Sequence, residues 1–277
     1  MAHIADLITA RFGLPSDVDP DWQEEGGIAD ILSRKSYRRY LSRDLPESLR
    51  STLLACAQSA SAKSDLQQYS IIDVRDQRIK DRLSEISAMA FLAKAPVVLI
   101  FCGDLRRAKR ITELRGKTYA QNNADSFMNA AVDAALAMQT YVLAAEMQGL
   151  GCCGVSQVRR DMNATCELLN IPEGVYPICG LTAGWPDEQR DVTLRLPPAA
   201  VVHRDGYGDE DFEENIDGYD QRRHAIRQIM PENYLQTEDY PPPEFYGWSE
   251  QVSRRLCKIG DLSAMGAFLK RQGFDLS

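Results

Sequence analysis

SFMNAAVDAALAMQTYVLAAEMQ, residues 126–148, carries the strongest structural signal in the chain. Alanine, methionine and other good helix formers fill the segment, and apolar residues occur around most of the helical circumference. Such a helix is buried on nearly all sides, so we expect it to be either the central helix of the core or a subunit interface. Gly149 and Gly151 end the helix, and a strand is expected to follow through Val155.

Helical and strand patterns alternate on both sides of this segment. A helix is expected to begin at Pro46 and Glu47, because apolar residues recur there at helical spacing, and the small polar run 59–64 after it indicates a loop. The other expected elements are a strand at 69–74, a helix at 77–90, a buried strand at 96–102, a helix at 159–169 and a buried strand at 175–185.

The two ends of the chain differ from this pattern. Residues 1–27 carry a short amphipathic stretch followed by Pro, Asp and Gly, so we expect a lead-in segment and a folded body that starts near Gly27. Residues 205–217 are acidic and contain glycine, prolines 241–243 stiffen a connection, and 249–272 is again amphipathic. This pattern predicts an extended arm that ends in a helix.

Composition limits the class of protein. The chain has 277 residues, is 44% hydrophobic and carries a formal net charge of -8. The chain is long enough to bury a full core. Because it is acidic overall, it has no general positive field that would attract nucleic acid. No apolar run reaches the roughly 18 residues of a membrane span, and the N-terminus lacks a signal-peptide pattern, so we expect a cytoplasmic protein without a membrane partner.

The seven cysteines are an odd number and mostly fall inside apolar elements. Buried, reduced thiols fit this distribution better than a disulfide framework. No CxxC pair or Cys/His cluster supports a metal site, so we expect none.

A cluster of cations is the main candidate binding motif. Arg34, Lys35, Ser36, Arg38 and Arg39 place cations and a hydroxyl close together after a short helical pattern. Arg34 and Ser36 can hydrogen-bond one phosphate while Arg38 reaches further along the same ligand. A solvated run of charge at a helix end is the alternative, and the motif alone leaves both open.

Nucleophile–base chemistry has little support. His3 lies near the terminus, His203 follows a Pro-rich turn and His224 lies in a charged run, so each fits a surface residue better than a general base. The adjacent Cys152 and Cys153 can in principle form a redox pair, but a vicinal disulfide is strained, and we favour two thiols in a strand.

The glycines Gly149, Gly151 and Gly154 have the spacing of a dinucleotide-binding fingerprint. They follow a predicted helix and enter a strand, which is the reverse of the order that this motif requires, so we reject it. What remains is a set of anion-binding and amide groups without an evident catalytic side chain. An enzyme whose cofactor carries the chemistry has this character.

Five short segments then follow one another in a specific order. They are Arg34-x-Ser36-x-Arg38, SAKSDLQ at 61–67, Gly149-Leu-Gly151, PICGLTAGWP at 177–186 and LRLP at 194–197. In this order they resemble the flavin-dependent nitroreductase family, in particular its branch of NADPH-flavin oxidoreductases and major oxygen-insensitive nitroreductases. The resemblance covers roughly residues 28–277.

The resemblance implies both fold and activity. The fold is an α+β sandwich in which a central, mostly antiparallel sheet is flanked by helices, and two chains form an intertwined homodimer with 126–148 at the interface. Residues 28–204 are the FMN-binding core, and 205–277 is an extension that wraps the core or the partner subunit. The implied reaction is ping-pong: NADPH or NADH reduces FMN, which then reduces a nitroaromatic, a quinone or a flavin.

The resemblance also assigns residues to the cofactor. Arg34 and Ser36 bind the FMN phosphate with Lys35 alongside, and Arg195 completes this group. Arg38 lies at the N1/O2 edge of the flavin ring, where a guanidinium stabilises the negative charge that reduction creates. No catalytic side chain is needed, because FMN carries the chemistry.

Further residues are assigned to the surroundings of the ring. The loop contributed by the partner subunit has Lys63, Ser64 and Gln67, and the segment along the ring has Ser156 and Gln157. Asp125 falls near the open face of the flavin as a substrate-pocket residue; an ordinary acid in the first turn of a helix is the alternative.

Three departures from the family pattern bear on the function. Thr193 replaces a frequent phosphate-binding lysine, Ser156 and Gln157 replace a pair of glycines, and 230–246 is acidic and Pro-rich instead of Arg-rich. FMN affinity and the preference between NADPH and NADH are therefore open. A flavin-binding sensor or carrier without efficient turnover is the alternative function, and the physiological acceptor is not given by the sequence.

Overall fold

The structure is a computed structural model that describes residues 1–258 and 264–275. The chain forms two compact units: Met1–Arg34 together with Asp191–Gly260, and Lys35–Arg190 together with Asp261–Ser277. We call them the outer unit and the sheet unit. The division into 1–27, 28–204 and 205–277 stays a prediction.

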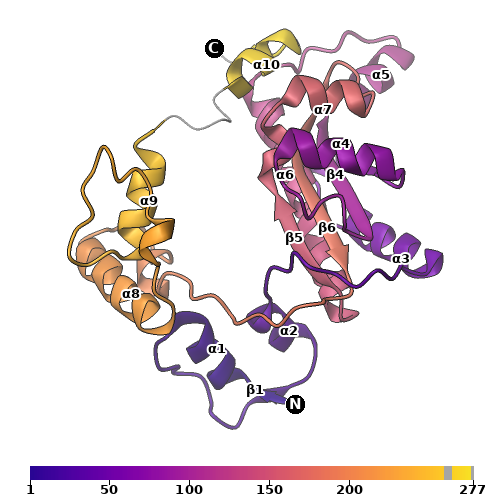
Figure 1. The fold of residues 1–277 in the computed structure, drawn as a ribbon. Helices are drawn as coiled ribbons and strands as arrows, with labels where there is room; N and C mark the ends of the chain where they lie inside the picture. The colour runs from indigo at the N-terminus through magenta and orange to yellow at the C-terminus, as the bar shows by residue number, and fades with distance from the viewer. Residues whose placement is uncertain (259–263, 276–277) are drawn as a thin grey trace. The chain divides into compact units, whose positions relative to one another are not determined.

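The sheet unit is built on four strands in the order β3-β4-β6-β5, and every neighbouring pair is antiparallel (Figure 1). This confirms the expected antiparallel sheet. The strands are β3 (Tyr69–Asp73), β4 (Val97–Asp104), β5 (Gly151–Val155) and β6 (Val175–Gly184).

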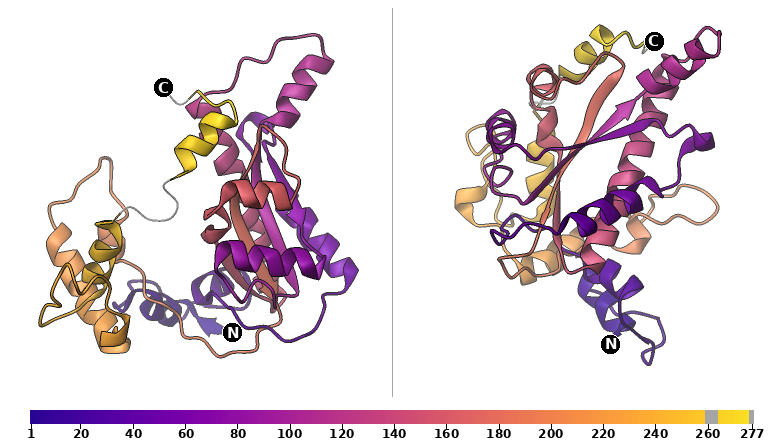
Figure 2. Two further views of the ribbon diagram at one scale, coloured as in Figure 1. Left: turned by 45° about the horizontal axis from the view of Figure 1, so that its top comes forward. Right: turned by 90° about the vertical axis from the view of Figure 1, so that its right-hand side faces the viewer.

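Helices cover both faces of this sheet (Figures 1 and 2). They are α3 (Glu47–Gln58) and α6 (Ala124–Met147) on one face, and α4 (Gln77–Ser87) and α7 (Met162–Leu168) on the other. Strand β4 separates two apolar cores, because alternate side chains of a strand point to opposite faces. Val98 and Ile100 pack with α4 and α7, whereas Leu99 and Phe101 pack with α3 and α6.

Helix α6 runs the length of the sheet but is not buried on all sides. Ala134 and Ala137 lie on the face that packs against the sheet and are fully buried. Met128, Val132 and Leu136, four residues apart, form a stripe that is 60%, 48% and 41% exposed. The expectation of burial nearly all round is therefore wrong for the single chain, because this stripe is left uncovered.

Shorter elements complete the sheet unit. In addition to the four covering helices, the sheet unit contains two short 3-10 helices, η1 (Lys63–Asp65) and η2 (Ser156–Arg159). It also contains the helices α5 (Arg106–Leu114) and α10 (Met265–Arg271). Phe274, just after α10, makes edge-to-face contacts with Phe127 and Tyr176. Residues 264–275 are thereby anchored in the apolar core that also contains Met162 and Cys166 of α7.

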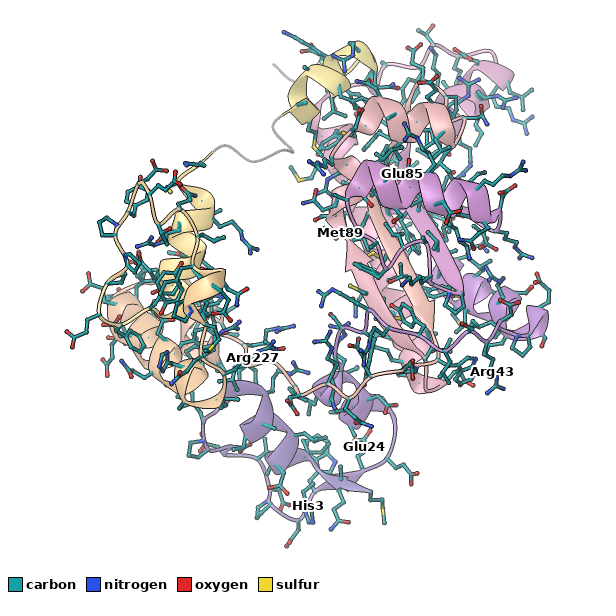
Figure 3. The ribbon with its side chains drawn as sticks, viewed as in Figure 1. His3, Glu24, Arg43, Glu85, Met89 and Arg227 are labelled. Carbon is teal, nitrogen blue, oxygen red and sulfur yellow. The ribbon has the colours of Figure 1, made fainter. Side chains whose placement is uncertain are left out.

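The outer unit is mostly helical. Its helices are α1 (Ile4–Phe12), α2 (Gly27–Ser33), α8 (Phe212–Ile226) and α9 (Trp248–Leu256), with the 3-10 helices η3 (Pro198–Ala200) and η4 (Pro231–Asn233). Two short strands, β1 (Ala2–His3) and β2 (Gln23–Glu24), pair antiparallel, and Figure 3 labels His3 and Glu24 in them.

Helix α8 corrects the expectation of an extended arm. Its first turn carries Glu213 and Glu214 and its last turn Arg223 and His224, an arrangement that the helix dipole favours. Asp220 of α8 accepts a 3.0 Å hydrogen bond from the backbone N–H of Ser249, which joins α8 to α9. In the expected helix at 249–272, residues 259–263 lie outside the described residues.

Two general features follow from the described part of the chain. No described helix is long and apolar enough to span a membrane. All seven cysteines are described and none is in a disulfide: four are buried, Cys56 and Cys179 are half-buried, and Cys257 is exposed.

Candidate functional site

The cation cluster lies where the chain passes from α2 to the edge of the sheet. Arg34 caps the C-terminus of α2. Two residues later Ser36 forms a parallel bridge with Cys152 of β5, and the Tyr37 N–H donates a 3.0 Å hydrogen bond to the Cys152 carbonyl. The backbone after Arg34 is therefore fixed to the edge strand β5.

Gly151 allows this close approach. A Cβ atom at Gly151 would lie 2.7 Å from ring atoms of Tyr37, which is shorter than real Cβ contacts. Gly149 has a φ of 77° and ends α6, and Gly151 begins β5. The glycine spacing thus serves a helix-to-strand turn, as the sequence order indicated.

Glu188 fixes the backbone of Arg38 and Arg39, the two residues that follow Tyr37. Its Oε1 accepts hydrogen bonds from the N–H groups of Arg38, at 2.7 Å, and Arg39, at 3.2 Å. Arg190 pairs with Oε2 at 2.9 Å. Burial by itself raises the pKa of Glu188, but the hydrogen bonds from Arg38, Arg190 and Arg39 outweigh it and hold the pKa below its ordinary value. Arg38 itself is exposed.

The loop that carries Lys63, Ser64 and Gln67 is held from below by a buried carboxylate. Asp133 of α6, 1% exposed, accepts hydrogen bonds from the N–H groups of Lys63 and Gln68 at 2.9 and 3.0 Å. Ser64 and Gln67 have positive φ values of 49° and 50°, so the loop turns sharply between these two anchors. All three predicted side chains are exposed.

Lys63 and Asp125 come together. The Lys63 Nζ lies 3.6 Å from Asp125 Oδ2, and both side chains are largely exposed. Asp125 is in the first turn of α6, and it also accepts a 2.8 Å hydrogen bond from Asn129. Arg107 fixes the far end of the loop by donating to the Gln67 carbonyl at 2.9 Å. The loop and the start of α6 therefore form one exposed surface.

Ser156 and Gln157 begin η2 directly after β5. Ser156 is exposed, whereas Gln157 is half-buried. The Oε1 atom of Gln157 is buried and accepts no hydrogen bond from any described residue. A buried acceptor without a partner is costly, so a ligand that offers an N–H group suits this position.

Arg195 lies in the outer unit, and its side chain is near carbonyl groups of its own segment. Its Nη1 is 3.5 Å from the carbonyl oxygens of Thr193 and Leu194. Its backbone N–H donates a 2.9 Å hydrogen bond to the carbonyl of Arg11. The guanidinium is exposed and thus accessible to an anion.

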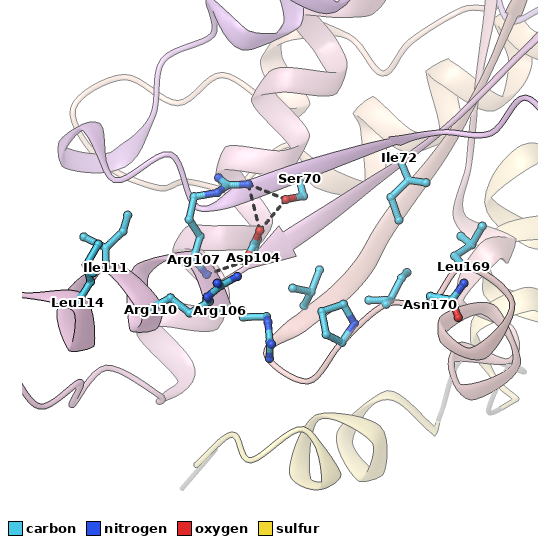
Figure 4. A pocket seen from close by; sticks show the side chains of 13 residues that line it. Ser70, Ile72, Asp104, Arg106, Arg107, Arg110, Ile111, Leu114, Leu169 and Asn170 are labelled. Atoms are coloured by element: carbon cyan, nitrogen blue, oxygen red, sulfur yellow. Dashed lines mark hydrogen bonds and ion pairs between the residues drawn. The ribbon is translucent and has the colours of Figure 1, made fainter.

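A cavity of about 660 Å³ opens beside α5 in the sheet unit and contains none of the predicted residues (Figure 4). In it, Arg107 donates to Ser70 Oγ at 2.7 Å and to Asp104 Oδ2 at 3.1 Å, so this arginine is occupied in holding β3 to β4. Arg106 and Arg110 also line the cavity.

Sequence reasoning missed the residues that position the site. Arg11, Asp133 and Glu188 each bind backbone groups of a segment carrying predicted ligands. Asp133, a charged residue inside a long apolar helix, was a visible signal, because such a residue is buried only with partners. Arg11 and Glu188 gave no comparable signal.

Comparisons with known proteins show which family the chain is similar to. The sequence profile of the nitroreductase family matches residues 31–185, and that of the nitroreductase family, C-terminal domain, matches residues 194–277. The FMN reductase (NADPH) of Bacillus subtilis (strain 168) is 34% identical over 253 residues, covering 90% of this chain and 98% of the relative. The Cr(VI) reductase of Pseudomonas sp. (strain G-1) is 32% identical over 196 residues, covering 70% and 81%.

Solved structures show the same relationship. NfrA2 of B. megaterium superposes with a TM-score of 0.80 at 31% identity, covering 90% of this chain and 98% of that one. The NADPH:FMN oxidoreductase from Vibrio harveyi, complexed with NAD+, gives a TM-score of 0.78 at 26% identity, covering 89% and 97%.

Proposed function

The chain belongs to the nitroreductase family, and we propose that it is an FMN-dependent NAD(P)H oxidoreductase whose acceptors are nitroaromatics, quinones or flavins. Relatives named FMN reductase and Cr(VI) reductase support this activity. When bound, FMN would supply the redox chemistry, namely acceptance of a hydride from NAD(P)H and donation of electrons to the acceptor. The protein binds, orients and tunes it.

Four residues hold the phosphate of FMN in this proposal. They are Arg34, Lys35, Ser36 and Arg195. Three cations and a hydroxyl suit a dianionic phosphate, because charge-assisted hydrogen bonds from guanidinium groups match its geometry. The bridge from Ser36 to β5 supports the assignment of Ser36, since it fixes the backbone of that residue.

Two further contacts orient the flavin ring. Arg38 would stabilise negative charge at the N1/O2 edge, and the hydrogen bond from its backbone N–H to Glu188 supports this role by fixing where the side chain starts. Gln157 Oε1 would accept a hydrogen bond from a ring N–H, and Ser156 would contribute beside it. The unpartnered Gln157 oxygen supports the assignment, because it fits a cofactor with a donor at that edge.

The functional unit is a homodimer in which each subunit completes the site of the other. The exposed stripe of Met128, Val132 and Leu136 supports this proposal, because an apolar face on the central helix is buried by a second copy. Lys63, Ser64 and Gln67 then contact the flavin from the partner subunit. Asp125, paired with Lys63, lines the substrate pocket.

The acceptor is a small molecule and the location is the cytoplasm, where NAD(P)H is available and the chain's thiols stay reduced. Membership of the family is the observation that carries the proposed activity. Steady-state oxidation of NADPH and of NADH with menadione, at equal concentrations of FMN-loaded protein, is its test. Rapid turnover with either donor is expected. FMN binding without turnover with both donors would instead establish a flavin carrier.

A further inference from the structure

Arg11 is a buried arginine, 6% exposed, near the end of α1. Its guanidinium donates to the carbonyls of two segments far apart in the sequence. From one side, Nη2 reaches the Arg34 carbonyl at 2.8 Å and the Leu32 carbonyl at 2.6 Å. From the other, Nη1 reaches the Thr193 carbonyl at 3.0 Å. One side chain thus joins the end of α2 to the segment before Arg195.

The backbone adds a second connection between the same parts of the outer unit. The carbonyl of Arg11 accepts a 2.9 Å hydrogen bond from the Arg195 N–H. Gly13, with a φ of 65°, turns the chain at the end of α1, and a Cβ atom there would lie 3.3 Å from the Leu194 side chain. Arg11 and Gly13 are therefore in contact with Thr193, Leu194 and Arg195.

Arg11 also supplies positive charge and hydrogen-bond donors at the C-terminal end of α2. Helix α2 has no basic residue in its last turn, and the last carbonyls of a helix lack partners inside it. A buried guanidinium satisfies the Leu32 and Arg34 carbonyls and adds positive charge at the negative end of the helix dipole. Loss of Arg11 leaves these groups unpaired and the end of α2 free to move.

We infer that Arg11 is a positioning residue for the phosphate site: it sets the backbone of Arg34 relative to that of Arg195. This inference rests on the proposed function, in which both arginines bind the FMN phosphate. Residues 1–30 lie outside both matching family profiles. The N-terminal segment, expected from the sequence to be a lead-in, thus supports cofactor binding through Arg11.

Riboflavin separates this role from general stabilisation, because it has the flavin ring of FMN but no phosphate. A residue that positions phosphate ligands affects FMN binding and leaves riboflavin binding nearly unchanged. A residue that only stabilises the fold affects both ligands alike. The ratio of the two dissociation constants is therefore the measured quantity.

The experiment compares full-length Arg11→Met and Arg11→Lys with wild type by flavin fluorescence titration. FMN affinity is expected to fall about tenfold or more in Arg11→Met, the cost of misplacing one charged hydrogen bond, while riboflavin affinity changes less than about twofold. Arg11→Lys keeps the charge but cannot reach both segments at once, so it is expected to lose FMN affinity as well.

Arg254→Met is the matched control. Arg254 is 3% exposed and lies in the same unit, and it likewise donates to carbonyls, those of Leu235 and Pro241. Its variant is expected to be less stable but to keep the wild-type ratio of FMN to riboflavin affinity.

Each outcome bears on one statement. The inference is overturned if the ratio of FMN to riboflavin affinity is unchanged in both Arg11 variants, or if it falls as far in Arg254→Met as in Arg11→Met. In either case FMN binding by the wild type leaves the proposed function intact. Where Arg11→Met does not fold, the ratio in Arg11→Lys decides. A wild-type protein that binds neither flavin removes the proposed function itself.

Discussion

The Oδ1 atom of Asp133, in the middle of α6, accepts a 2.9 Å hydrogen bond from the backbone N–H of Lys63. The same carboxylate accepts the N–H of Gln68 through its other oxygen at 3.0 Å. A single buried side chain thereby shapes the loop proposed to reach the partner's flavin. This loop has no other anchor on α6 apart from the exposed pair of Lys63 with Asp125 among the described contacts.

Replacing Asp133 by Ala is expected to lower the free energy of unfolding by about 2–4 kcal/mol, because two backbone N–H groups lose a charged acceptor. FMN affinity should fall with it, since the loop loses its shape. Urea denaturation and flavin titration measure the two effects. Asp125→Ala, at an exposed position, is the control and should change stability by less than about 1 kcal/mol. Equal effects of the two variants would contradict the anchoring role.

Glu188→Gln gives a prediction with a defined pH dependence. The pKa of Glu188 is lower in the folded protein than in the unfolded chain, so its stabilisation is present above the unfolded pKa. It is lost as pH falls through the folded pKa. The difference in unfolding free energy between wild type and Glu188→Gln should be largest near neutral pH. It should begin to decrease at about pH 4.3, the ordinary pKa of glutamate, and vanish below the folded pKa. Denaturation curves across this range measure it; a pH-independent difference would be inconsistent with the ionised hydrogen bonds.

Gly151→Ala is expected to destabilise the protein by about 1–3 kcal/mol, because the new methyl group overlaps the Tyr37 ring. The double variant with Tyr37→Ala should recover part of this loss, since the overlap is gone. Gly266→Ala in α10 is the control: nothing lies within 4 Å of its Cβ position. Thermal unfolding of wild type, Gly151→Ala, Tyr37→Ala, the double variant and the control tests the pair, and additive losses would rule out the steric explanation.

Arg195→Ala and Arg38→Ala should separate binding from reactivity. Arg195→Ala is expected to weaken FMN binding by about 1.5–3 kcal/mol, the range for a lost charged hydrogen bond. Arg38→Ala is expected to slow flavin reduction by NAD(P)H more than it weakens binding, because its charge acts on the reduced ring. Flavin titration and stopped-flow reduction measure the two quantities. Unchanged FMN affinity in Arg195→Ala would remove that residue from the site.

Val132→Glu should prevent dimerisation, because two copies of the charge would face an apolar contact. Sedimentation velocity should show a dimer for wild type and a monomer for the variant, and the variant should also lose FMN. Ile111→Glu, at an apolar position on α5 that is 54% exposed, is the control and should stay dimeric. A monomeric wild type would refute the two-subunit site.

The periodic elements were predictable from the sequence. Strand β4 has an unbroken apolar run that is buried on both faces, and α3 and α6 have helical spacing over several turns. Helix α8 was missed, because the acidic composition of 205–217 obscured a helix that begins at Phe212. Composition is a weaker guide there than the distribution of charge between the two helix ends.

Arg11 and Glu188 could not be predicted as positioning residues, because their partners are distant in the sequence and no local pattern marks them. Arg11 binds Thr193, and Glu188 binds Arg38. A charged residue with such a partner has the same local sequence signature as an exposed one, and only the tertiary structure distinguishes them. The exposed stripe on α6 is a related case, because its apolar residues look the same whether a core or a second chain covers them.

The most direct test of the central claim is the visible absorption spectrum of the protein after incubation with FMN and desalting, followed by NADPH or NADH under exclusion of oxygen. We predict that the flavin band is retained on the protein, disappears on addition of at least one donor and returns when menadione is added. A protein that retains no flavin, or whose flavin band is unchanged by both donors, would contradict an FMN-dependent NAD(P)H oxidoreductase.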